Sequence, residues 1–342
     1  MIAWIPMALP VAVFFAAWWL TGRFRRYAID QHLLDVPNAR SSHVAATPRG
    51  GGMAIVLCVL AALPALAASG LVDWTPVIAA VGGGALVAAL GFADDHGDIP
   101  MRWRLLGHFA AAAWVVTWLG GSPPVVAFGG TVDLGQWGYA LAVVYVVWLL
   151  NVTNFMDGID GLAAVETITV SLGAVLVVLV TMPGSRLWLA PAVLAAATLG
   201  FLVWNWPPAR IFMGDAGSGF LGLILATLSL QSAWERPVLF WSWLVLLGVF
   251  AVDATFTRAR RATQSWRFYE PHRSHAYQHA SRRWGSHRRV TVGVAAINVL
   301  WLLPIALAVA AGLVSGPPAV AIAYLPLVAA AVWLKAGVSL PA

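Results

Sequence analysis

Long apolar segments separated by short polar loops recur along the whole chain. Most of them have close to the twenty residues that a helix needs to cross the hydrocarbon core of a membrane. The pattern therefore predicts an all-α, polytopic membrane bundle, a single domain over residues 1–342 with about eleven transmembrane helices. The predicted spans are 2–20, 50–69, 75–92, 105–119, 138–152, 159–181, 187–204, 217–232, 238–257, 290–312 and 318–335.

Two of the loops between these segments have features of their own. The loop 120–137 is rich in Gly and Pro and contains a short alternating stretch, which predicts a small hairpin. The loop 258–289 is the longest and holds nine arginines and four histidines. We expect part of it to form a surface helix.

The distribution of basic residues predicts the orientation of the chain. If loop 21–49 is cytoplasmic, eighteen of the twenty Lys and Arg residues fall on the cytoplasmic side, and only Arg186 and Arg236 on the other. Because cytoplasmic loops are enriched in basic residues, this predicts a periplasmic N-terminus and a cytoplasmic C-terminus. Most acidic residues follow the same side, which places the polar chemistry at one membrane surface, the cytoplasmic one.

Composition narrows the class of protein further. The chain is 61% hydrophobic and only 10% charged, with a mean hydropathy of +0.81. In such a chain the net charge of +6 reflects membrane orientation, and nucleic-acid binding is not expected. The single cysteine, Cys58, excludes an intrachain disulfide. A cleaved signal peptide is not expected either, because the first arginines follow the first apolar segment.

The clearest candidate for chemistry is NVTNFMDGIDGL, residues 151–162. Asp157 and Asp160 are three residues apart, a spacing that places two side chains on one face of a helix, and Asn151 and Asn154 precede them. Carboxylate and amide oxygens together can hold a hard cation, and they can also bind a phosphorylated ligand.

A second acidic cluster, Asp94, Asp95 and Asp98, ends the third predicted span, with Arg102 and Arg104 close behind. Adjacent carboxylates repel, and a divalent ion or an arginine relieves that repulsion. A solvated loop of mixed charge explains the same pattern without any function. The sequence of this segment alone does not decide between the two interpretations.

The third acid, Asp215, lies in NWPPARIFMGDAGS (residues 205–218), between Gly214 and Gly217. Small neighbours let a carboxylate face a metal or let backbone amides approach a phosphate. Simple N-capping of the following helix is the alternative. Asn205 and Phe212, in the same segment, are candidates to hold a nucleotide base by hydrogen bonding and stacking.

Two basic loops offer donors for phosphate groups. The segment EPHRSHAYQHASRR (270–283) contains His272, Arg273, His275 and His279. Zinc binding is conceivable there, but cationic contacts to a diphosphate are favoured, and a basic patch that attracts anionic lipid is the alternative. The loop 35–52 adds His43 and Arg49 as further phosphate-facing candidates.

Three acidic clusters are thus predicted to meet at one membrane face. Oxygen ligands without cysteine favour Mg²⁺, or Mn²⁺, over zinc. A hard cation beside arginines and histidines is the arrangement that phosphoryl transfer uses.

The ordered motifs resemble those of the polyprenyl-phosphate N-acetylhexosamine-1-phosphate transferases, the superfamily that includes the MurNAc-pentapeptide translocase. The shared motifs are DxPNxRxxH at 35–43, GG at 51–52, DDxxD at 94–98, NxxNxxDGxDGL at 151–162, FMGDAGS at 212–218 and the His-rich loop at 272–279. The resemblance implies transfer of a sugar 1-phosphate from a UDP-N-acetylhexosamine to undecaprenyl phosphate, with release of UMP and a need for Mg²⁺.

The resemblance also implies roles for individual residues. Asp94 and Asp95 look like catalytic aspartates near the lipid phosphate, and Asp215, with Asp94, looks like a magnesium ligand. Asn154, Asp157 and Asp160 resemble the nucleotide-facing group. The HRSHAYQ segment departs from the triple-histidine form of the muramyl-pentapeptide enzymes. It is more like the branch that initiates O-antigen, with GlcNAc or a 6-deoxy sugar such as FucNAc or QuiNAc as substrate.

Several questions stay open at this level. Direct attack by the lipid phosphate is favoured over a two-step route through an aspartyl phosphate. A transporter or lipid flippase, or a scaffold without turnover, are rival functions, although a transporter would place its ionisable residues at the membrane midplane. The sugar, the glycan pathway and the oligomeric state are not determined, and a homodimer is one of the states allowed.

Overall fold

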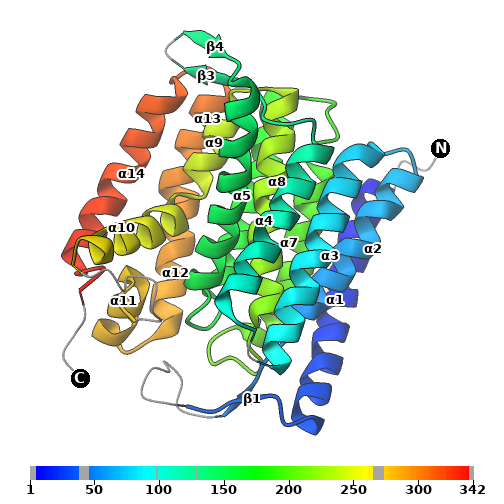
Figure 1. Cartoon of the computed structure of the whole chain (residues 1–342), viewed down its shortest axis with the longest axis vertical. Coiled ribbons are helices and arrows are strands. Elements are labelled where there is room, and N and C mark those ends of the chain that lie inside the picture. The colour runs from blue at the N-terminus through cyan, green and yellow to red at the C-terminus, as the bar shows by residue number, and fades with distance from the viewer. Residues whose placement is uncertain (1–4, 38–45, 98, 128, 265–272, 339–342) are drawn as a thin grey trace.

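The computed structural model describes residues 5–37, 46–97, 99–127, 129–264 and 273–338, and these residues form a bundle of helices (Figure 1). Successive long helices run in alternating directions along the vertical axis of that view. The helices are α1 (Ile5–Asp30), α2 (Met53–Ala68), α3 (Trp74–His96), α4 (Met101–Trp118), α5 (Gly135–Met156), α6 (Leu162–Thr181), α7 (Leu189–Asn205), α8 (Asp215–Glu235), α9 (Leu239–Leu246), α10 (Gly248–Gln264), α11 (Ala276–Trp284), α12 (His287–Ile297), the π-helical turn η1 (Asn298–Leu302), α13 (Leu303–Ala310) and α14 (Gly316–Trp333).

The predicted all-α membrane fold is confirmed. In the described part of the chain, seven helices or continuous helical runs are long and apolar enough to cross a membrane, and the α9–α10 pair raises the number to as many as eight. Helices α2 and α7 are shorter apolar helices. Each of the eleven predicted spans coincides with a helix or a run of helices. How many of them cross, and in which direction, stays a prediction.

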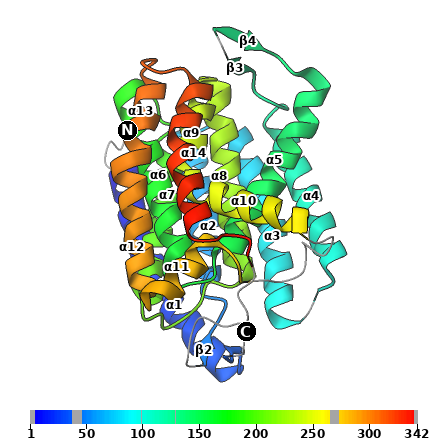
Figure 2. The ribbon, with the colours of Figure 1, turned by 90° about the vertical axis from the view of Figure 1, so that its left-hand side faces the viewer.

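The predicted ninth span, 238–257, is wrong as a single continuous helix. Helix α9 ends at Leu246, and α10 leaves it at an angle of 69°. Figure 2 shows α10 running across the direction that α8 and α9 follow. The predicted surface helix in the following loop is confirmed by the end of α10 and by α11.

Helix α8 is the centre of the bundle and is almost completely buried. Glycines let its first turn approach two neighbours closely. A Cβ atom on Gly52 would lie 2.5 Å from the Cα atom of Gly217, and one on Gly91 would lie 2.4 Å from the backbone nitrogen of Ala216. Small residues at these crossings therefore bring the N-terminal end of α2 and the C-terminal part of α3 against the start of α8.

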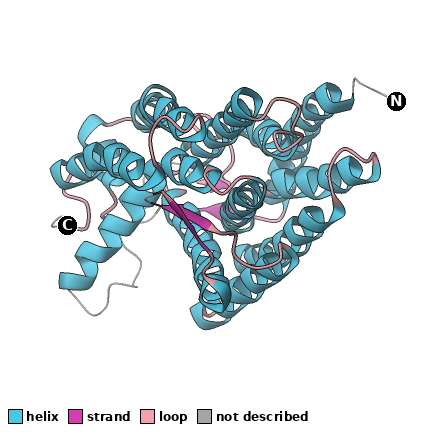
Figure 3. Ribbon diagram, turned by 90° about the horizontal axis from the view of Figure 1, so that it is seen from above, coloured by secondary structure: helices cyan, strands magenta, loops and turns pink. Residues whose placement is uncertain are grey.

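Two short hairpins complete the fold. Strands β3 (Val125–Ala127) and β4 (Gly130–Val132) form the hairpin expected in loop 120–137, and it lies across one end of the bundle (Figure 3). The Trp241 indole N–H donates to the carbonyl of Val126 and ties this hairpin to α9. At the other end, β1 (Leu34–Asp35) pairs antiparallel with β2 (Thr47–Pro48).

The end of the bundle that holds β1 and β2 also gathers the polar helix termini. The C-terminal ends of α1, α3 and α5 and the N-terminal end of α8 all lie there, at the lower end in Figure 1. The predicted meeting of three distant acidic clusters at one face is therefore what the fold produces.

Candidate active site

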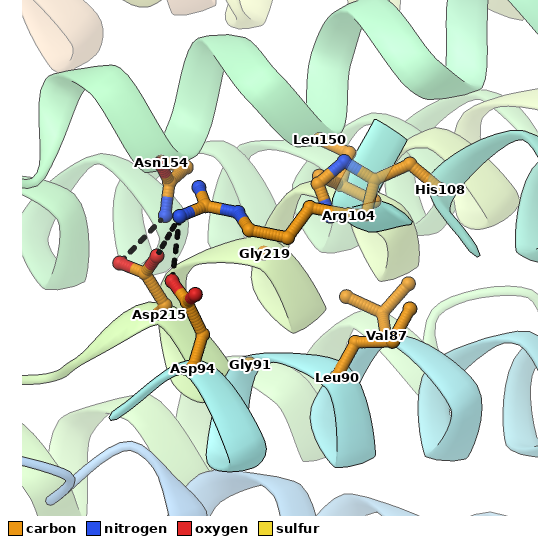
Figure 4. Close-up of a pocket in the computed structure, with 10 residues that line it drawn as sticks. All are labelled: Val87, Leu90, Gly91, Asp94, Arg104, His108, Leu150, Asn154, Asp215 and Gly219. Atoms are coloured by element: carbon orange, nitrogen blue, oxygen red, sulfur yellow. Dashed lines mark hydrogen bonds and ion pairs between the residues drawn. The ribbon is translucent and has the colours of Figure 1, made fainter. Parts of the chain in front are cut away.

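Asp94 and Asp215, from the end of α3 and the start of α8, lie together around the guanidinium group of Arg104 on α4 (Figure 4). The Arg104 Nη1 atom is 2.5 Å from Asp94 Oδ2 and 3.3 Å from Asp215 Oδ2. Asn154 on α5 donates from Nδ2 to Asp215 Oδ1 at 3.2 Å. Four helices thus supply two carboxylates, one amide and one cation to a single cluster, which we call the acid–arginine cluster.

A small pocket opens beside this cluster. Its polar wall consists of the four residues of the acid–arginine cluster together with His108 on α4. Apolar side chains, including Val87, Leu90 and Leu150, form the rest of the wall. The lining of this pocket thus places charged and polar groups beside apolar side chains.

Asp95, next to Asp94, has a different environment. It is 6% exposed, and its carboxylate accepts hydrogen bonds from the backbone N–H groups of Asp215 (3.2 Å) and Ala216 (3.4 Å) at the start of α8. Arg49 Nη2 donates to the Asp95 carbonyl at 2.5 Å. Asp95 therefore satisfies the first turn of α8 and fixes Asp215 in place.

This arrangement decides between the two interpretations of Asp215. The residue before α8 is Gly214, which has no side chain that could cap the helix. The Asp95 carboxylate, at the end of α3, accepts from the first N–H group of α8 instead. The Asp215 carboxylate is left to face Arg104 and Asn154. Asp215 therefore does more than cap a helix.

Asp157 lies in the turn between α5 and α6, where burial and three neighbouring acids act on its carboxyl group. Desolvation by the surrounding protein, followed by repulsion from Asp215, Asp95 and Asp160, raises the pKa of Asp157 well above its ordinary value. The neutral form of Asp157 is thus favoured until a cation or a cationic donor approaches.

This raised pKa predicts a pH effect on stability. Between the ordinary carboxyl pKa, about 4, and the raised native pKa, the unfolded chain is ionised while the folded chain keeps its proton. The free energy of unfolding therefore falls as the pH rises through that window. We expect Asp157→Asn to reduce this slope and to raise the melting temperature at pH 8.

Thermal unfolding of metal-free protein in detergent, measured from pH 5 to pH 9, checks this expectation. Asp30→Asn, an exposed acid at the end of α1, is the matched control and should keep the wild-type slope. An unchanged pH slope in Asp157→Asn would show that the Asp157 carboxyl titrates in the ordinary range.

Asp160 and Asn205 hold loops together. Asp160 Oδ2 accepts from the Ala209 backbone N–H at 3.0 Å and lies 3.3 Å from His287 Nδ1. Asn205 is buried, accepts from the Gly161 N–H at 2.9 Å and donates to the Ile211 carbonyl at 2.9 Å. The hydrogen bonds of both residues thus hold the segment 157–161 against the segment 205–211.

Two other candidates from the sequence lie outside the acid–arginine cluster. The amide of Asn151 donates to the Val147 carbonyl of its own helix at 2.7 Å. The backbone N–H of Phe212 donates to the Pro48 carbonyl, and the Phe212 carbonyl accepts from the Gly51 N–H. These two hydrogen bonds join strand β2 and the residues after it to the segment before α8. The base-binding role proposed for Asn205 and Phe212 stays a prediction.

His275 is buried and is paired with an acid that the sequence did not single out. Its Nδ1 atom is 3.2 Å from Asp253 Oδ1 on α10, and Asp253 also accepts from the backbone N–H groups of Ala276 and Tyr277, both at 2.9 Å. Asp253 therefore caps α11. The Tyr277 hydroxyl donates in turn to the Phe155 carbonyl at 3.1 Å, two residues from Asp157.

The other basic residues predicted from the sequence lie in different environments. His275 is the N-cap residue of α11, whereas His279 lies inside the helix, where burial and then Arg282 lower the pKa of its imidazole. The Arg273 carbonyl accepts from Arg282 Nη2 at 2.9 Å. His272, His43 and Asp98 lie outside the described residues.

The acid–arginine cluster matches the donor set of a hard cation. Asp94 and Asp215 offer carboxylate oxygen atoms from two helices, and Mg²⁺ is commonly held by one or two carboxylates with phosphate oxygens completing its shell. Within the described residues no group of three His, Cys, Asp or Glu side chains is arranged to hold a metal by itself. The donor set therefore fits a cation shared with a phosphorylated ligand better than a closed protein cage.

Comparisons with known proteins give matches to a family model and to named relatives. The model of glycosyl transferase family 4 matches residues 77–233. A Bacillus subtilis (strain 168) protein named "Probable undecaprenyl-phosphate N-acetylglucosaminyl 1-phosphate transferase" is 32% identical over 279 residues, which cover 80% of this chain and 76% of that protein.

Two further relatives carry related names. A "Decaprenyl-phosphate N-acetylglucosaminephosphotransferase" of Mycobacterium tuberculosis (strain CDC 1551 / Oshkosh) is 30% identical, covering 92% of this chain and 83% of that protein. A "Phospho-N-acetylmuramoyl-pentapeptide-transferase" of Moorella thermoacetica (strain ATCC 39073 / JCM 9320) is 42% identical over 139 residues, covering 40% of this chain and 43% of that protein.

Proposed function

The chain belongs to glycosyl transferase family 4, and from that premise we propose that it transfers an N-acetylhexosamine 1-phosphate from a UDP-sugar to a polyprenyl phosphate and releases UMP. The observation that carries this proposal is the acid–arginine cluster at one end of an apolar bundle. A lipid phosphate lies at the membrane surface while its chain lies in the hydrocarbon, so its reaction needs polar groups at the ends of membrane helices.

Mg²⁺ fits the carboxylate oxygens of Asp215 and Asp94, and Mn²⁺ fits the same oxygens. When bound, such a cation neutralises charge on the diphosphate of the UDP-sugar. Arg104 lies where it can add a second positive charge to the same phosphate groups. His275 and Arg273, with Arg49, are further proposed phosphate contacts.

In the proposed reaction an oxygen atom of the lipid phosphate attacks the sugar-bearing phosphorus. A new P–O bond forms, the P–O bond to UMP breaks, and UMP leaves with the bonding electrons. A phosphate monoester already carries a charge of about −1.5 to −2 at pH 7, so it needs little deprotonation. We favour this direct attack over an aspartyl-phosphate route, with Asp94 accepting or orienting the last proton.

The adjacent acids Asp94 and Asp95 have different roles in the proposed reaction. Asp94 lines the pocket beside Asp215, whereas Asp95 is buried under the first turn of α8. Asp94 is thus the proposed catalytic acid or base, and Asp95 acts by fixing Asp215. Asp157, Asp160, Asn151 and Asn154 stay the proposed nucleotide-sugar side of the site.

The acceptor proposed here is undecaprenyl phosphate. The names of two relatives, which mention N-acetylglucosaminyl or N-acetylglucosamine transfer, favour GlcNAc. The departure of HRSHAYQ from a triple histidine favours GlcNAc, FucNAc or QuiNAc over a muramyl pentapeptide. We also propose that the product enters the synthesis of O-antigen or another envelope glycan. The active site is proposed to lie at the cytoplasmic face of the bacterial inner membrane.

Release of UMP tests the proposal directly. Purified protein in detergent is incubated with undecaprenyl phosphate, Mg²⁺ and UDP-GlcNAc, UDP-FucNAc or UDP-QuiNAc in separate reactions. We expect UMP and a lipid-linked diphosphate sugar in equal amounts from at least one donor, and none without lipid. In vesicles that contain the protein, lipid movement between leaflets without UMP release would favour the flippase alternative.

A further inference from the structure

The last part of the chain carries a one-sided charge that the proposed reaction does not use. Glu270 is the last acidic side chain, so residues 271–342 contain six Lys and Arg residues and no Asp or Glu. The first 270 residues hold fourteen side chains of each sign. The whole net charge of +6 therefore arises from the last 72 residues.

Four of these basic side chains lie around the turn that joins α11 to α12, and all four are exposed. They are Arg282 and Arg283 at the end of α11 and Arg288 and Arg289 at the start of α12. The turn is short because Gly285 ends α11 in the left-handed conformation and the Ser286 hydroxyl caps α12. We call residues 282–289 the basic turn.

The contacts of these arginines leave their charge uncompensated. Arg282 Nη2 donates to the Arg273 carbonyl at 2.9 Å, and Arg289 Nη1 donates to the Trp284 carbonyl at 3.4 Å. Among the residues that the structure describes, no ion pair joins an arginine of the basic turn to a carboxylate. An anion from outside the chain is therefore the group that would balance this charge.

Exposed tryptophans accompany the basic turn. Trp284 belongs to the turn itself and is 40% exposed, and Trp333, at the end of α14, is 56% exposed. The Arg283 guanidinium lies over the Trp333 ring, 4.4 Å from its centroid. Tryptophan is enriched where a membrane meets water, with its ring at the level of the lipid headgroups. Arginine beside exposed tryptophan thus favours a headgroup environment for this surface.

The position of the basic turn also favours a membrane surface. The helical run that begins at its end, His287–Ala310, is one of those long and apolar enough to cross a membrane. The turn lies at the polar end of the bundle, where Figure 1 shows α11 and the start of α12. Two contacts join α12 to the loop before α6: Thr291 Oγ1 donates to the Asp160 carbonyl at 3.0 Å, and His287 Nδ1 lies 3.3 Å from Asp160 Oδ2.

We propose that the basic turn binds the headgroups of anionic phospholipids in the membrane that surrounds the bundle. Arginine clusters next to a membrane helix attract anionic lipid, and the guanidinium fork matches the oxygens of a lipid phosphate. Basic residues that only orient a chain during insertion would leave no lipid preference in the folded protein. The proposal concerns the lipid around the protein and does not depend on the proposed function.

Local quenching of a fluorophore tests the proposal. The fluorophore is attached at position 284, through Trp284→Cys in a Cys58→Ala background, and the full chain is reconstituted in phosphatidylcholine vesicles. Equal amounts of phosphatidylglycerol or phosphatidylcholine, spin-labelled close to the headgroup, are added in separate samples. We expect phosphatidylglycerol to quench at least about threefold more strongly, because each arginine near the surface adds attraction for anionic lipid. A fluorophore at position 106, exposed on α4, is the reference and should be quenched equally by both lipids.

Two triple variants separate the basic turn from net charge. The test variant is Arg283→Gln/Arg288→Gln/Arg289→Gln, and it should lower the quenching ratio at position 284 by at least about twofold. The matched control is Arg23→Gln/Arg26→Gln/Arg102→Gln, which removes three exposed arginines of α1 and α4 and should keep the ratio. Because the Debye length falls to about 3 Å at 1 M salt, 1 M NaCl should lower the ratio of the unchanged turn as well.

Several results would overturn the proposal. Equal quenching by the two lipids at position 284 would show no preference, and quenching by neither would place the turn in water. The same ratio at positions 284 and 106, or an equal loss in both triple variants, would assign the effect to the whole protein. If the test variant does not accumulate in membranes, the salt dependence decides the question. None of these measurements requires turnover, so their result is independent of the UMP-release assay.

Discussion

Replacing Asp215 by asparagine is expected to reduce transfer by about 1000-fold, since a metal-supporting carboxylate is worth several kcal/mol of transition-state stabilisation. Asp94→Asn should have an effect of similar size, because its carboxylate shares Arg104 with Asp215. Both changes keep the volume of the side chain, so the bundle should remain folded. The initial rate of UMP release at saturating UDP-sugar and lipid is the measurement.

Asp30→Asn is the matched control for both variants. Asp30 is an exposed acid at the same end of the bundle, at the end of α1. Its replacement should leave the rate within about twofold of the wild type, because a solvated surface charge contributes little. If Asp215→Asn kept a tenth or more of wild-type activity, Asp215 would not be the principal metal ligand.

Arg104→Ala is expected to lower the transfer rate by about 100-fold, the size found when one preorganised donor to a developing charge is removed. The guanidinium is the cation that lies between Asp94 and Asp215, and its loss leaves two neighbouring carboxylates without compensation. Arg104→Lys keeps the charge but not the fork of donors, so it should keep more activity than the alanine variant.

Arg102→Ala tests whether this effect belongs to the site or to the surface charge of α4. Arg102 is exposed and its guanidinium lies 5.7 Å from the ring centroid of Trp103. Its replacement should change the rate less than threefold. Equal losses in Arg102→Ala and Arg104→Ala would mean that Arg104 acts only through net charge. A wild-type rate in Arg104→Ala would remove it from the site.

The sequence predicted the fold well where apolar length is the deciding signal. Spans such as 159–181 and 217–232 coincide with α6 and α8 because a run of apolar residues in a membrane has to become a helix. The α9–α10 break was not predicted. The apolar run continues through Leu247 and Gly248, and Tyr324, whose hydroxyl donates to the Leu244 carbonyl at the break, comes from the distant helix α14.

The site was predicted in part, for a similar reason. Asp94 and Asp215 stand out as acids in an apolar chain, and the structure brings them together with Asn154. Asn205 was singled out as a polar residue beside a candidate segment, but composition does not reveal that Gly161 and Ile211 engage its amide.

The geometry makes prominent two residues that the sequence analysis did not include in its predicted site. The sequence placed Arg104 behind the acids Asp94 and Asp95 and offered an arginine as one way to relieve their repulsion, but it did not predict that Arg104 also pairs with Asp215. Asp253 was counted only among the acids on one side, although it pairs with His275 twenty-two residues away. Contacts at such separations depend on the fold and not on local pattern.

Binding of Mn²⁺, followed by electron paramagnetic resonance in the presence of UDP, tests most directly whether Asp94 and Asp215 share one cation. The wild type and Asp30→Asn should bind one Mn²⁺ per chain that excess Mg²⁺ displaces. Asp94→Asn and Asp215→Asn should each bind Mn²⁺ at least about tenfold more weakly, which corresponds to about 1.4 kcal/mol. Wild-type affinity in both variants would contradict a metal site at the acid–arginine cluster.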